Sequence, residues 1–392
     1  MSKTNQPVSL EPQSSRTNKI RVMHGISSWA MGGTERMLTH LIPHFDKTRF
    51  DSCLMCFNSP SPVSKEWKAS GIEVYHLNMD KRVSIIGIVR CMKLLRQWKP
   101  DILIVYGLRA NLMARIAAWL CRIPVFVTGQ RGIEDWKGRF EVFLERATSV
   151  FVDLYIGNSQ ACCDMLANRE KISRKKLHAI PNGIDFKTPD NFDMRTREIR
   201  TKHTIPPDSF IIGTVGRLQS VKGHHDFIAA AEIVLRKHPE AYFMLVGEDF
   251  RNGELQAMAK HLQIDERVRF VGYSKDVAIW LSVFDIFVLP SLSEGMPVAV
   301  IEAMFMSKPV IATKVGGTPE VIHEGQTGIL IPPSNPTQMA ESIITLIENP
   351  ALRQKYAAAG YDRAVSHFTA EIMTKRYGEI FIELLRKKKK YA

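Results

Sequence analysis

Two glutamates separated by eight positions, Glu294 and Glu302, are the side chains that point most directly to chemistry in this sequence. Glu302 stands alone between two runs of four apolar residues in VAVIEAMFM, and Pro297, immediately before it, suits the first turn of a helix. A helix that is apolar all round is buried, and an ionised carboxylate there is costly unless something hydrogen-bonds to it. The sequence therefore predicts that Glu302 lies buried and needs a polar partner.

Glu294 lies in the segment SLSEGMP, which follows an apolar strand expected at 285–290. A strand, a short loop with Gly and Pro, and then a helix form the junction at which open α/β sheets bind ligands. The N–H groups of Gly295, Met296 and Val298 would lie at the positive end of the helix, and Glu302 would lie one turn along the same face. We therefore expect both carboxylates to face one crevice and to bind a ligand with hydroxyl and phosphate groups.

Two cations, Arg217 and Lys222, occur in GRLQSVKG after another expected strand. Cations at the carboxyl end of a strand and beside a helix N-terminus can clamp a pyrophosphate, Arg as a bidentate donor and Lys as a point charge. Either residue alone would more often be a solvated loop charge. The pair together predicts a phosphate site.

A glycine pair, Gly32 and Gly33, follows the first expected strand at 19–26. With Gly25 it does not have the GxGxxG spacing of the dinucleotide-binding fingerprint. The pair nevertheless opens an expected helix, where bare backbone can approach a phosphate or a sugar. A simple tight turn is the alternative interpretation.

Strand and helix patterns alternate along the chain, which predicts the α/β fold class with doubly wound parallel sheets. A polar, charged stretch at 188–204 reads as a linker between domains at 19–187 and 205–368, with a disordered segment at 1–18 and a helix with a basic tail at 369–392. Further strands are expected at 50–57, 73–77, 101–105, 124–128, 242–246, 268–271, 309–313 and 328–331, and a strand followed by a turn at 178–186. Helices are expected near 84–98, 109–120 and 139–152 and from 336 onward.

The composition narrows the class of protein. A length of 392 residues favours two or three domains. Hydrophobic residues make up 45% and charged residues 24% of the chain, which is typical of globular proteins. The six cysteines form no matched CxxC pairs, which favours reduced core cysteines of a cytoplasmic protein. No run approaches the roughly 18 apolar residues of a membrane span, and the N-terminus has no apolar signal region, so we expect neither a spanning nor a secreted protein.

The positive charge is concentrated at two places. Residues 1–190 contain 28 basic residues (Lys and Arg) and 17 acidic residues (Asp and Glu). Residues 191–385 contain 20 basic and 23 acidic residues, and the tail RKKKK at 386–390 adds five cations. No nucleic-acid recognition motif accompanies this charge, so we expect no nucleic-acid partner. An anionic membrane surface or an anionic acceptor is the favoured partner, and a merely soluble basic surface is the alternative.

Six segments of the C-terminal half occur in a characteristic order: GRLQSVKG, LVGED, VRFVGYS, DIFVLPSLSEGMPVAVIEAM, PVIATKVGGTPEVI and TGILIPP. In order and spacing they resemble the EX7E group of retaining GT-B glycosyltransferases, glycosyltransferase family four. MGGTER, NSQA and IPNGID resemble the N-terminal half of that family, and the likeness covers most of residues 19–370. The resemblance implies two Rossmann-like domains facing a cleft, the first for the acceptor and the second for a nucleotide-sugar, with the final helix crossing back to the N-terminal domain.

The resemblance also implies roles for individual residues. Arg217 and Lys222 would hold the diphosphate of the donor, and a ribose cis-diol would be the partner of Glu302. Because Arg, Lys and helix ends would stabilise the leaving diphosphate, and no DxD string occurs at the cleft, neither a metal nor another cofactor is implied. The remaining donor contacts would be Glu294 with Gly295, Met296, Pro297 and Val298 at the sugar ring, Gly32 and Gly33 at the phosphate, and Gly272 and Tyr273 at the nucleobase.

The sequence departs from the family at the acceptor side. Many relatives carry a histidine after the fourth or fifth strand, whereas this chain has Tyr106-Gly107-Leu108 and Gly129-Gln130-Arg131 there. Gln130 or Arg131 is a candidate for the positioning donor, unless the acceptor itself differs. His24, at the end of the first strand, is a further candidate, with a satisfied core histidine as the alternative.

The expected reaction is transfer of a sugar, with retention of configuration, from a nucleotide-diphospho-sugar to a hydroxyl of a glycan or lipid-linked acceptor in cell-surface polysaccharide, exopolysaccharide or lipopolysaccharide synthesis. The expected location is cytoplasmic, peripheral on the inner face of the membrane. Alternatives are an epimerase or phosphorylase of the same fold, a glycosyltransferase with a small soluble acceptor, and an inactive carbohydrate-binding protein. The sugar, the base and the acceptor are not specified by this sequence.

Overall fold

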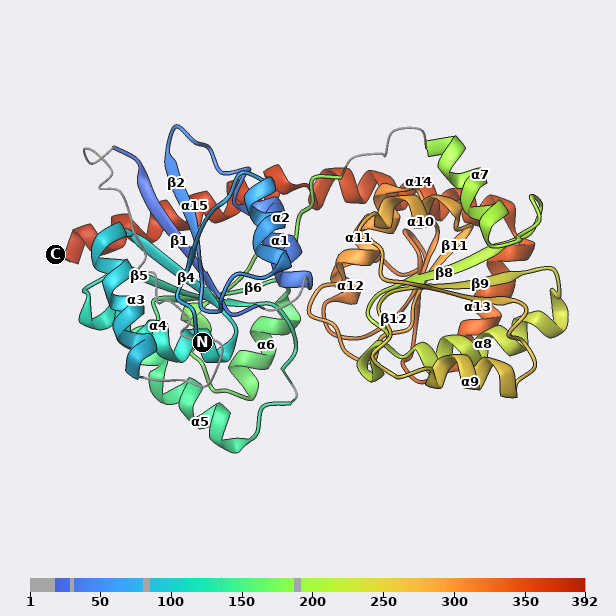
Figure 1. Cartoon of the computed structure of the whole chain (residues 1–392), viewed down its shortest axis with the longest axis horizontal. Helices are drawn as coiled ribbons and strands as arrows, with labels where there is room; N and C mark the ends of the chain where they lie inside the picture. The colour runs from blue at the N-terminus through green and yellow to red at the C-terminus, as the bar shows by residue number, and fades with distance from the viewer. Residues whose placement is uncertain (1–17, 29–31, 80–84, 135, 187–191, 392) are drawn as a thin grey trace, which may run out of the picture. The chain divides into compact units, whose positions relative to one another are not determined.

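The computed structural model describes residues 18–28, 32–79, 85–134, 136–186 and 192–391, and it divides into two compact units. Unit 1 combines Met1–Gly183 with Ala370–Ala392, and unit 2 is Ile184–Thr369. The last helix of the chain, α15 (Ala370–Tyr391), therefore belongs to the same unit as the N-terminal sheet. Each unit is an α/β domain with its own parallel sheet (Figure 1), as the sequence predicts.

Unit 1 contains a seven-stranded sheet in the order β3-β2-β1-β4-β5-β6-β7, and every adjacent pair is parallel. The order reverses between β1 and β4, which is the topological switch point of a doubly wound sheet. The strands are β1 (Ile20–Ile26), β2 (Phe50–Cys56), β3 (Glu73–His76), β4 (Ile102–Tyr106), β5 (Val125–Gln130), β6 (Leu154–Gly157) and β7 (Leu177–Ala179).

Helices cover both faces of this sheet. Val22 and Ile104 belong to the core against α1, α2 and α15, whereas Met23 and Leu103, one position along each strand, belong to the core against α3, α4 and α6. This alternation is the two-residue period of a strand whose two faces are both buried. The helices are α1 (Gly33–Leu41), α2 (Pro62–Ala69), α3 (Ile85–Trp98), α4 (Leu108–Leu120), α5 (Arg139–Thr148) and α6 (Gln160–Asn168).

Unit 2 contains a six-stranded parallel sheet in the order β10-β9-β8-β11-β12-β13, with its switch point between β8 and β11. Its strands are β8 (Ile211–Val215), β9 (Tyr242–Val246), β10 (Val268–Gly272), β11 (Ile286–Leu289), β12 (Val310–Thr313) and β13 (Ile329–Ile331). Its helices are α7 (Phe192–Lys202), α8 (His224–Lys237), α9 (Glu254–His261), α10 (Val277–Val283), α11 (Val298–Phe305), α12 (Thr318–Val321), α13 (Pro336–Glu348) and α14 (Pro350–His367).

The stretch 188–204, which the sequence suggests only as a linker, contains the helix α7. Thr196 hydrogen-bonds Ser282 over 2.8 Å, Arg195 pairs with Asp276 over 2.9 Å, and Ile199 is buried. The helix is difficult to recognise in this highly charged stretch because its contact with the rest of unit 2 depends on few apolar side chains. Residues 187–191, and residues 1–17 of the N-terminal segment expected at 1–18, lie outside the described residues.

Two other local details differ from the sequence expectations. Pro297 is the N-cap of α11 rather than a residue of its first turn, and the helix begins at Val298. The helix expected at 139–152 ends at Thr148 and continues as the short 3-10 helix Ser149–Phe151. No helix among the described residues is long and apolar enough to cross a membrane.

Candidate functional site

The predicted donor residues of unit 2 gather at the carboxyl ends of its strands. Glu294 follows β11, and its Oε1 accepts a hydrogen bond from Ser291 Oγ over 2.6 Å and lies 2.7 Å from Lys222 Nζ. The Lys222 and Glu294 side chains are 29% and 10% exposed, so the pair is partly shielded from water. Because Lys222 follows β8 and Glu294 follows β11, this ion pair spans the switch point of the sheet, where open α/β sheets bind ligands.

The backbone fixes the position of Lys222. Its loop ends in the short 3-10 helix Ser220–Lys222 and turns at Gly223, which has φ +64°. A Cβ at Gly223 would lie 2.0 Å from the Pro290 carbonyl oxygen, and the Leu292 N–H donates to the Val221 carbonyl oxygen over 2.8 Å. The loops after β8 and β11 are therefore joined through their main chains, and glycine is needed where they touch.

A second close approach supports Glu294 from the other side. Gly316, in the turn after β12, has φ +49°, and a Cβ there would lie 1.7 Å from the Glu294 carbonyl oxygen. The neighbouring Gly317 N–H donates to the Gly295 carbonyl oxygen over 3.0 Å. Two consecutive glycines after a strand are the sequence signal for such a close backbone approach.

Arg217 lies on the same loop as Lys222 but has different neighbours. Its guanidinium carbon is 5.9 Å from the centre of the Phe250 ring. The adjacent Gly216 has a carbonyl oxygen 1.8 Å from where a Cβ of Gly247 would lie, so the loops after β8 and β9 are also packed backbone to backbone. Arg217 and Lys222 are thus held by one rigid loop, as expected, while the Phe250 contact is a feature that sequence reasoning did not find.

Glu302 is 6% exposed in α11, as the sequence predicts, with buried apolar residues on both sides in the helix. It is not without a partner in the chain. The chain therefore supplies at least part of the polar partner that the sequence predicts for this carboxylate, and Glu302 lies one turn below Val298 as expected. Met296 is also buried, Gly295 and Pro297 are buried beside it, and Val298 opens the helix.

The predicted nucleobase segment is the end of β10. Gly272 has φ +81°, and its carbonyl oxygen accepts from the Gly247 N–H over 2.9 Å, which connects it to the loop after β9. Tyr273 follows with its side chain 55% exposed. The structure thus leaves an exposed aromatic ring at the carboxyl edge of the sheet, where it is free to stack on a planar ligand.

In unit 1, Gly32 is the N-cap of α1 and Gly33 is its first residue. The Arg36 N–H donates to the Gly32 carbonyl oxygen over 3.0 Å, and a Cβ on Gly33 would meet nothing within 4 Å. The nine-residue helix therefore begins at bare backbone that follows β1, as predicted, beside the switch point of this sheet. Residues 29–31, immediately before it, lie outside the described residues.

His24, one of the acceptor-side candidates, is completely buried on β1. Its Nδ1 lies 3.3 Å from the Tyr106 hydroxyl, and its Nε2 has no hydrogen-bond partner among the residues that the structure describes. Burial lowers the pKa of His24 to about 3, so the ring is neutral at physiological pH. These surroundings favour the core-histidine interpretation over a catalytic one.

Gln130 and Arg131 are committed to contacts within unit 1. The Gln130 amide donates to the Gly132 carbonyl oxygen over 2.7 Å. Arg131 donates to the Asn182 side chain and, over 3.4 Å, to the Tyr377 hydroxyl on α15. Tyr377 is itself fully buried, so Arg131 connects the end of β5 to both the IPNGID segment and the last helix. Sequence reasoning did not identify Tyr377 or Asn182.

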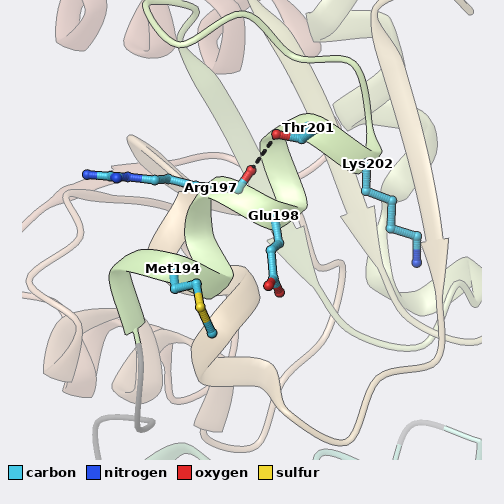
Figure 2. A pocket seen from close by; sticks show the side chains of 5 residues that line it. All are labelled: Met194, Arg197, Glu198, Thr201 and Lys202. Carbon is cyan, nitrogen blue, oxygen red and sulfur yellow. Dashed lines mark hydrogen bonds between the residues drawn. The ribbon is translucent and has the colours of Figure 1, made fainter.

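An open hollow elsewhere in unit 2 is lined by α7 alone (Figure 2). Figure 2 shows that its side chains do not converge on one point, and the hydrogen bond drawn there, from Thr201 Oγ1 to the Arg197 carbonyl oxygen over 3.0 Å, is internal to the helix. No predicted site residue contributes to it. The lining residues are Met194, Arg197, Glu198, Thr201 and Lys202.

Two family models match the chain in succession. Residues 31–188 match the model described as Glycosyltransferase Family 4, and residues 195–363 match the model described as Glycosyl transferases group 1. An Escherichia coli UDP-Gal:alpha-D-GlcNAc-diphosphoundecaprenol alpha-1,3-galactosyltransferase is 24% identical over 360 residues, 86% of this chain and 90% of that protein. The Staphylococcus aureus capsular polysaccharide biosynthesis glycosyltransferase CapM is 24% identical over 343 residues, 83% of this chain and 89% of that protein.

The crystal structure of Anabaena HepE in complex with UDP-glucose has the same fold, with a TM-score of 0.83 and 21% identity over 93% of this chain and all of that chain. The strand orders of the two sheets, the motifs at their carboxyl edges and the two family models all support the same family assignment. The chain belongs to the group 1, family four glycosyltransferases, and its fold is GT-B.

Proposed function

We propose that the chain is a retaining, metal-independent glycosyltransferase that moves a sugar from a nucleotide-diphospho-sugar to a hydroxyl of a lipid-linked glycan in cell-surface polysaccharide synthesis. The observation that supports this most strongly is the 2.7 Å pair between Lys222 and Glu294 at the switch point of unit 2. A cation that can bind a diphosphate and a carboxylate that can accept sugar hydroxyls lie side by side in this pair. A nucleotide-sugar presents its diphosphate and its sugar ring in the same relation.

The ion pair is compatible with donor binding. A lysine ammonium carries three N–H donors, so Lys222 can keep one hydrogen bond to Glu294 and offer two to phosphate oxygens. Arg217, on the same loop, offers a bidentate fork to a further phosphate oxygen pair. Both cations would lie where negative charge develops as the nucleoside diphosphate departs, which is where a fixed positive charge accelerates the reaction.

In the proposed reaction the bond between the anomeric carbon and the diphosphate oxygen breaks, and a bond to the acceptor oxygen forms on the same face of the sugar. The acceptor proton passes to a diphosphate oxygen, so no side-chain base is needed. Glu294 then has a positioning role: its second oxygen accepts hydrogen bonds from the sugar hydroxyls while Ser291 and Lys222 hold Oε1. Attack on the face from which the diphosphate leaves would retain the configuration of the donor.

The relatives guide the choice of donor and acceptor. HepE was crystallised with UDP-glucose, and the name of the Escherichia coli relative specifies UDP-galactose and a diphosphoundecaprenol-linked acceptor. The Rhizobium meliloti relative LpsE is named for lipopolysaccharide core biosynthesis. We therefore propose a UDP-sugar as donor, a lipid-linked glycan as acceptor and a peripheral location on the inner face of the membrane for this chain.

Donor binding is tested by thermal unfolding of the full chain with UDP-, GDP-, ADP- and dTDP-sugars in EDTA. A ligand that binds only the native state raises stability by about 2.7 kcal/mol at a hundredfold excess over its dissociation constant. We expect one class of nucleotide-sugar to raise Tm, and expect that class to be hydrolysed slowly without acceptor. Release of free sugar distinguishes a transferase from an epimerase, which would return an isomeric nucleotide-sugar, and from a phosphorylase, which would need inorganic phosphate.

A further inference from the structure

The outward face of α5 is apolar. Phe140, Phe143 and Val150 are 67%, 64% and 73% exposed, and their spacing of three and seven residues places them along one side of the helix and its 3-10 extension. Trp136, just before the helix, is 66% exposed. We call these four residues the α5 apolar stripe. Large apolar side chains that gather in this way on a surface mark a site of interaction.

The inward face of α5 is polar, which explains why the stripe faces out. Glu145 is 2% exposed and pairs with the fully buried Arg115 of α4. Arg115 also donates to Thr148 Oγ1 over 2.7 Å, and the Tyr155 hydroxyl donates to Glu145 over 3.0 Å. Turning the helix to bury its phenylalanines would leave a buried arginine without its partner, which is strongly unfavourable.

A second buried ion pair fixes the segment that leads into α5. Lys137 Nζ lies 2.9 Å from Glu170 and 2.6 Å from Glu134, and Lys137 and Glu170 are both buried. Trp136 is adjacent to Lys137. The buried lysine side chain therefore fixes the backbone that carries the exposed tryptophan. The orientation of the α5 apolar stripe is therefore built into the unit by two buried ion pairs.

The apolar surface continues onto the neighbouring helix. Trp119, near the end of α4, is 62% exposed, and its ring centre lies 5.7 Å from that of Phe151 in the 3-10 helix that follows α5. Leu120 is 47% exposed beside it. The surface thus includes two tryptophans, which prefer the boundary between lipid and water.

Among the charged residues of α5, the two that are exposed are positive, and one acid, Glu141, is partly exposed. Arg139 and Arg146 are exposed on α5 next to the phenylalanines. The acids of α5 are engaged, because Glu145 is paired within the unit and Glu141 accepts the Gly138 N–H over 3.0 Å at the start of the helix. Lys388 of α15 lies 2.7 Å from Asp153, three residues beyond Val150, so the basic end of the chain reaches the same part of unit 1.

We propose that the α5 apolar stripe, with Arg139 and Arg146, binds the surface of an anionic lipid bilayer, with α5 in the plane of the interface and its phenylalanines at the headgroup boundary. Aromatic side chains flanked by arginines match that boundary, in which apolar groups enter the acyl region and cations meet phosphate. The proposal deepens the proposed function, since it specifies how a peripheral enzyme would reach a lipid-linked acceptor. It does not depend on the identity of the donor.

The test is co-sedimentation of the full chain with vesicles of phosphatidylglycerol and phosphatidylethanolamine, and with neutral phosphatidylcholine vesicles. We compare wild type, Phe140→Ser with Phe143→Ser, Arg139→Gln with Arg146→Gln, and a control in unit 2, Tyr361→Ser with Val365→Ser, whose side chains are each 43% exposed. The phenylalanine variant should lose at least tenfold in affinity for anionic vesicles, and the arginine variant several-fold. The control should bind as wild type, and neutral vesicles should bind all four weakly.

Binding of the phenylalanine variant equal to that of wild type, or absence of wild-type binding to anionic vesicles, would overturn the proposal. So would a lipid-free wild type that sediments as a dimer together with a monomeric phenylalanine variant, since a second copy would then cover the stripe. Far-UV circular dichroism and Tm show that the variants are folded. Donor hydrolysis in detergent-free buffer, which these substitutions should leave unchanged, separates the two proposals: vesicle binding without any hydrolysis contradicts the proposed function alone.

Discussion

Lys222 Nζ lies 2.7 Å from Glu294 Oε1, and this contact joins two loops whose residues are 72 positions apart in the chain. It brings the predicted phosphate ligand and the predicted sugar ligand together at the switch point of unit 2. Gly223 and Gly316 hold the two loops in place by backbone contact. The pair is therefore a product of the fold of unit 2 rather than a chance surface contact.

We predict that Arg217→Ala and Lys222→Ala each lower kcat strongly and leave the fold intact. One fixed donor at the charge that develops in the transition state is worth about 3 kcal/mol, roughly a hundredfold in rate. Steady-state kinetics with the donor identified by thermal shift measure this loss. The matched control is Lys202→Ala, which removes an exposed cation of α7 and should leave kcat unchanged. Near-normal kcat in both site variants would mean that the loop is not a diphosphate clamp.

Gly316→Ala should lower activity without changing any polar side chain. Gly316 has φ +49°, and an added Cβ would lie 1.7 Å from the Glu294 carbonyl oxygen, so the Glu294 loop must move. Gly325→Ala is the control, because Gly325 has φ +68° but nothing within 4 Å of the new Cβ. We expect both variants to lose about 1 kcal/mol from the left-handed conformation and only Gly316→Ala to raise KM for the donor or lower kcat. Equal kinetics of Gly316→Ala and Gly325→Ala would mean that the position of the Glu294 loop does not affect donor binding or turnover.

Glu302→Gln should weaken donor binding by about tenfold, about 1.4 kcal/mol, if its carboxylate accepts the ribose hydroxyls. Because Glu302 also has a partner within the chain, Glu302→Leu tests whether this residue instead stabilises the fold. Calorimetric titration with the nucleoside diphosphate and Tm measurements report on the two roles separately. A glutamine variant that binds normally, together with a leucine variant that unfolds, would make Glu302 purely structural.

Much of this architecture can be predicted from the sequence. The alternation of strands and helices predicts both parallel sheets, because strand periodicity and glycine turns are local signals. The position of Glu294 after β11 and the burial of Glu302 follow from the same local pattern. The pairing of Lys222 with Glu294 and of Arg131 with Tyr377 does not, because partners 72 and 246 positions apart are decided by the packing of whole elements.

The helix α5 shows most clearly where local pattern is insufficient. Its sequence predicts a helix, and the periodicity of Phe140 and Phe143 alone would place them in the core. The ion pair between Arg115 and Glu145 reverses that choice, since the buried charge of one helix requires a partner from the other. The helix α7 was concealed for a related reason, because its buried contact rests largely on Ile199 and a hydroxyl pair with Ser282.

Stability should fall as the pH drops below about 6.5. Burial lowers the pKa of both His24 and His224 to about 3, while unfolding restores it to about 6.5. Between these values the unfolded chain binds more protons, so each histidine removes about 1.4 kcal/mol of stability per pH unit as the pH falls. Urea unfolding at pH 7 and pH 5 measures the slope. His24→Phe should reduce it.

A chain that ends at Leu385 should bind anionic vesicles less tightly than the full chain, but should lose less affinity than Phe140→Ser with Phe143→Ser. Lys387 lies 2.6 Å from Glu383 and Lys388 lies 2.7 Å from Asp153, so part of the tail charge is balanced within unit 1. Each cation near an anionic leaflet contributes about 1 kcal/mol. Raising the salt concentration should weaken binding by both chains, because charge attraction is screened over about 8 Å at physiological ionic strength.

The most direct test of the central claim follows the anomeric carbon. The full chain is incubated in EDTA with UDP-sugars labelled with carbon-13 at that position, with water or a glycan alcohol as acceptor, and the first product is observed by NMR. We expect that one donor is consumed, that the product keeps the anomeric configuration of the donor, and that Lys222→Ala lowers the rate roughly a hundredfold. An inverted product, a requirement for added metal, or undiminished turnover by Lys222→Ala would contradict the central claim.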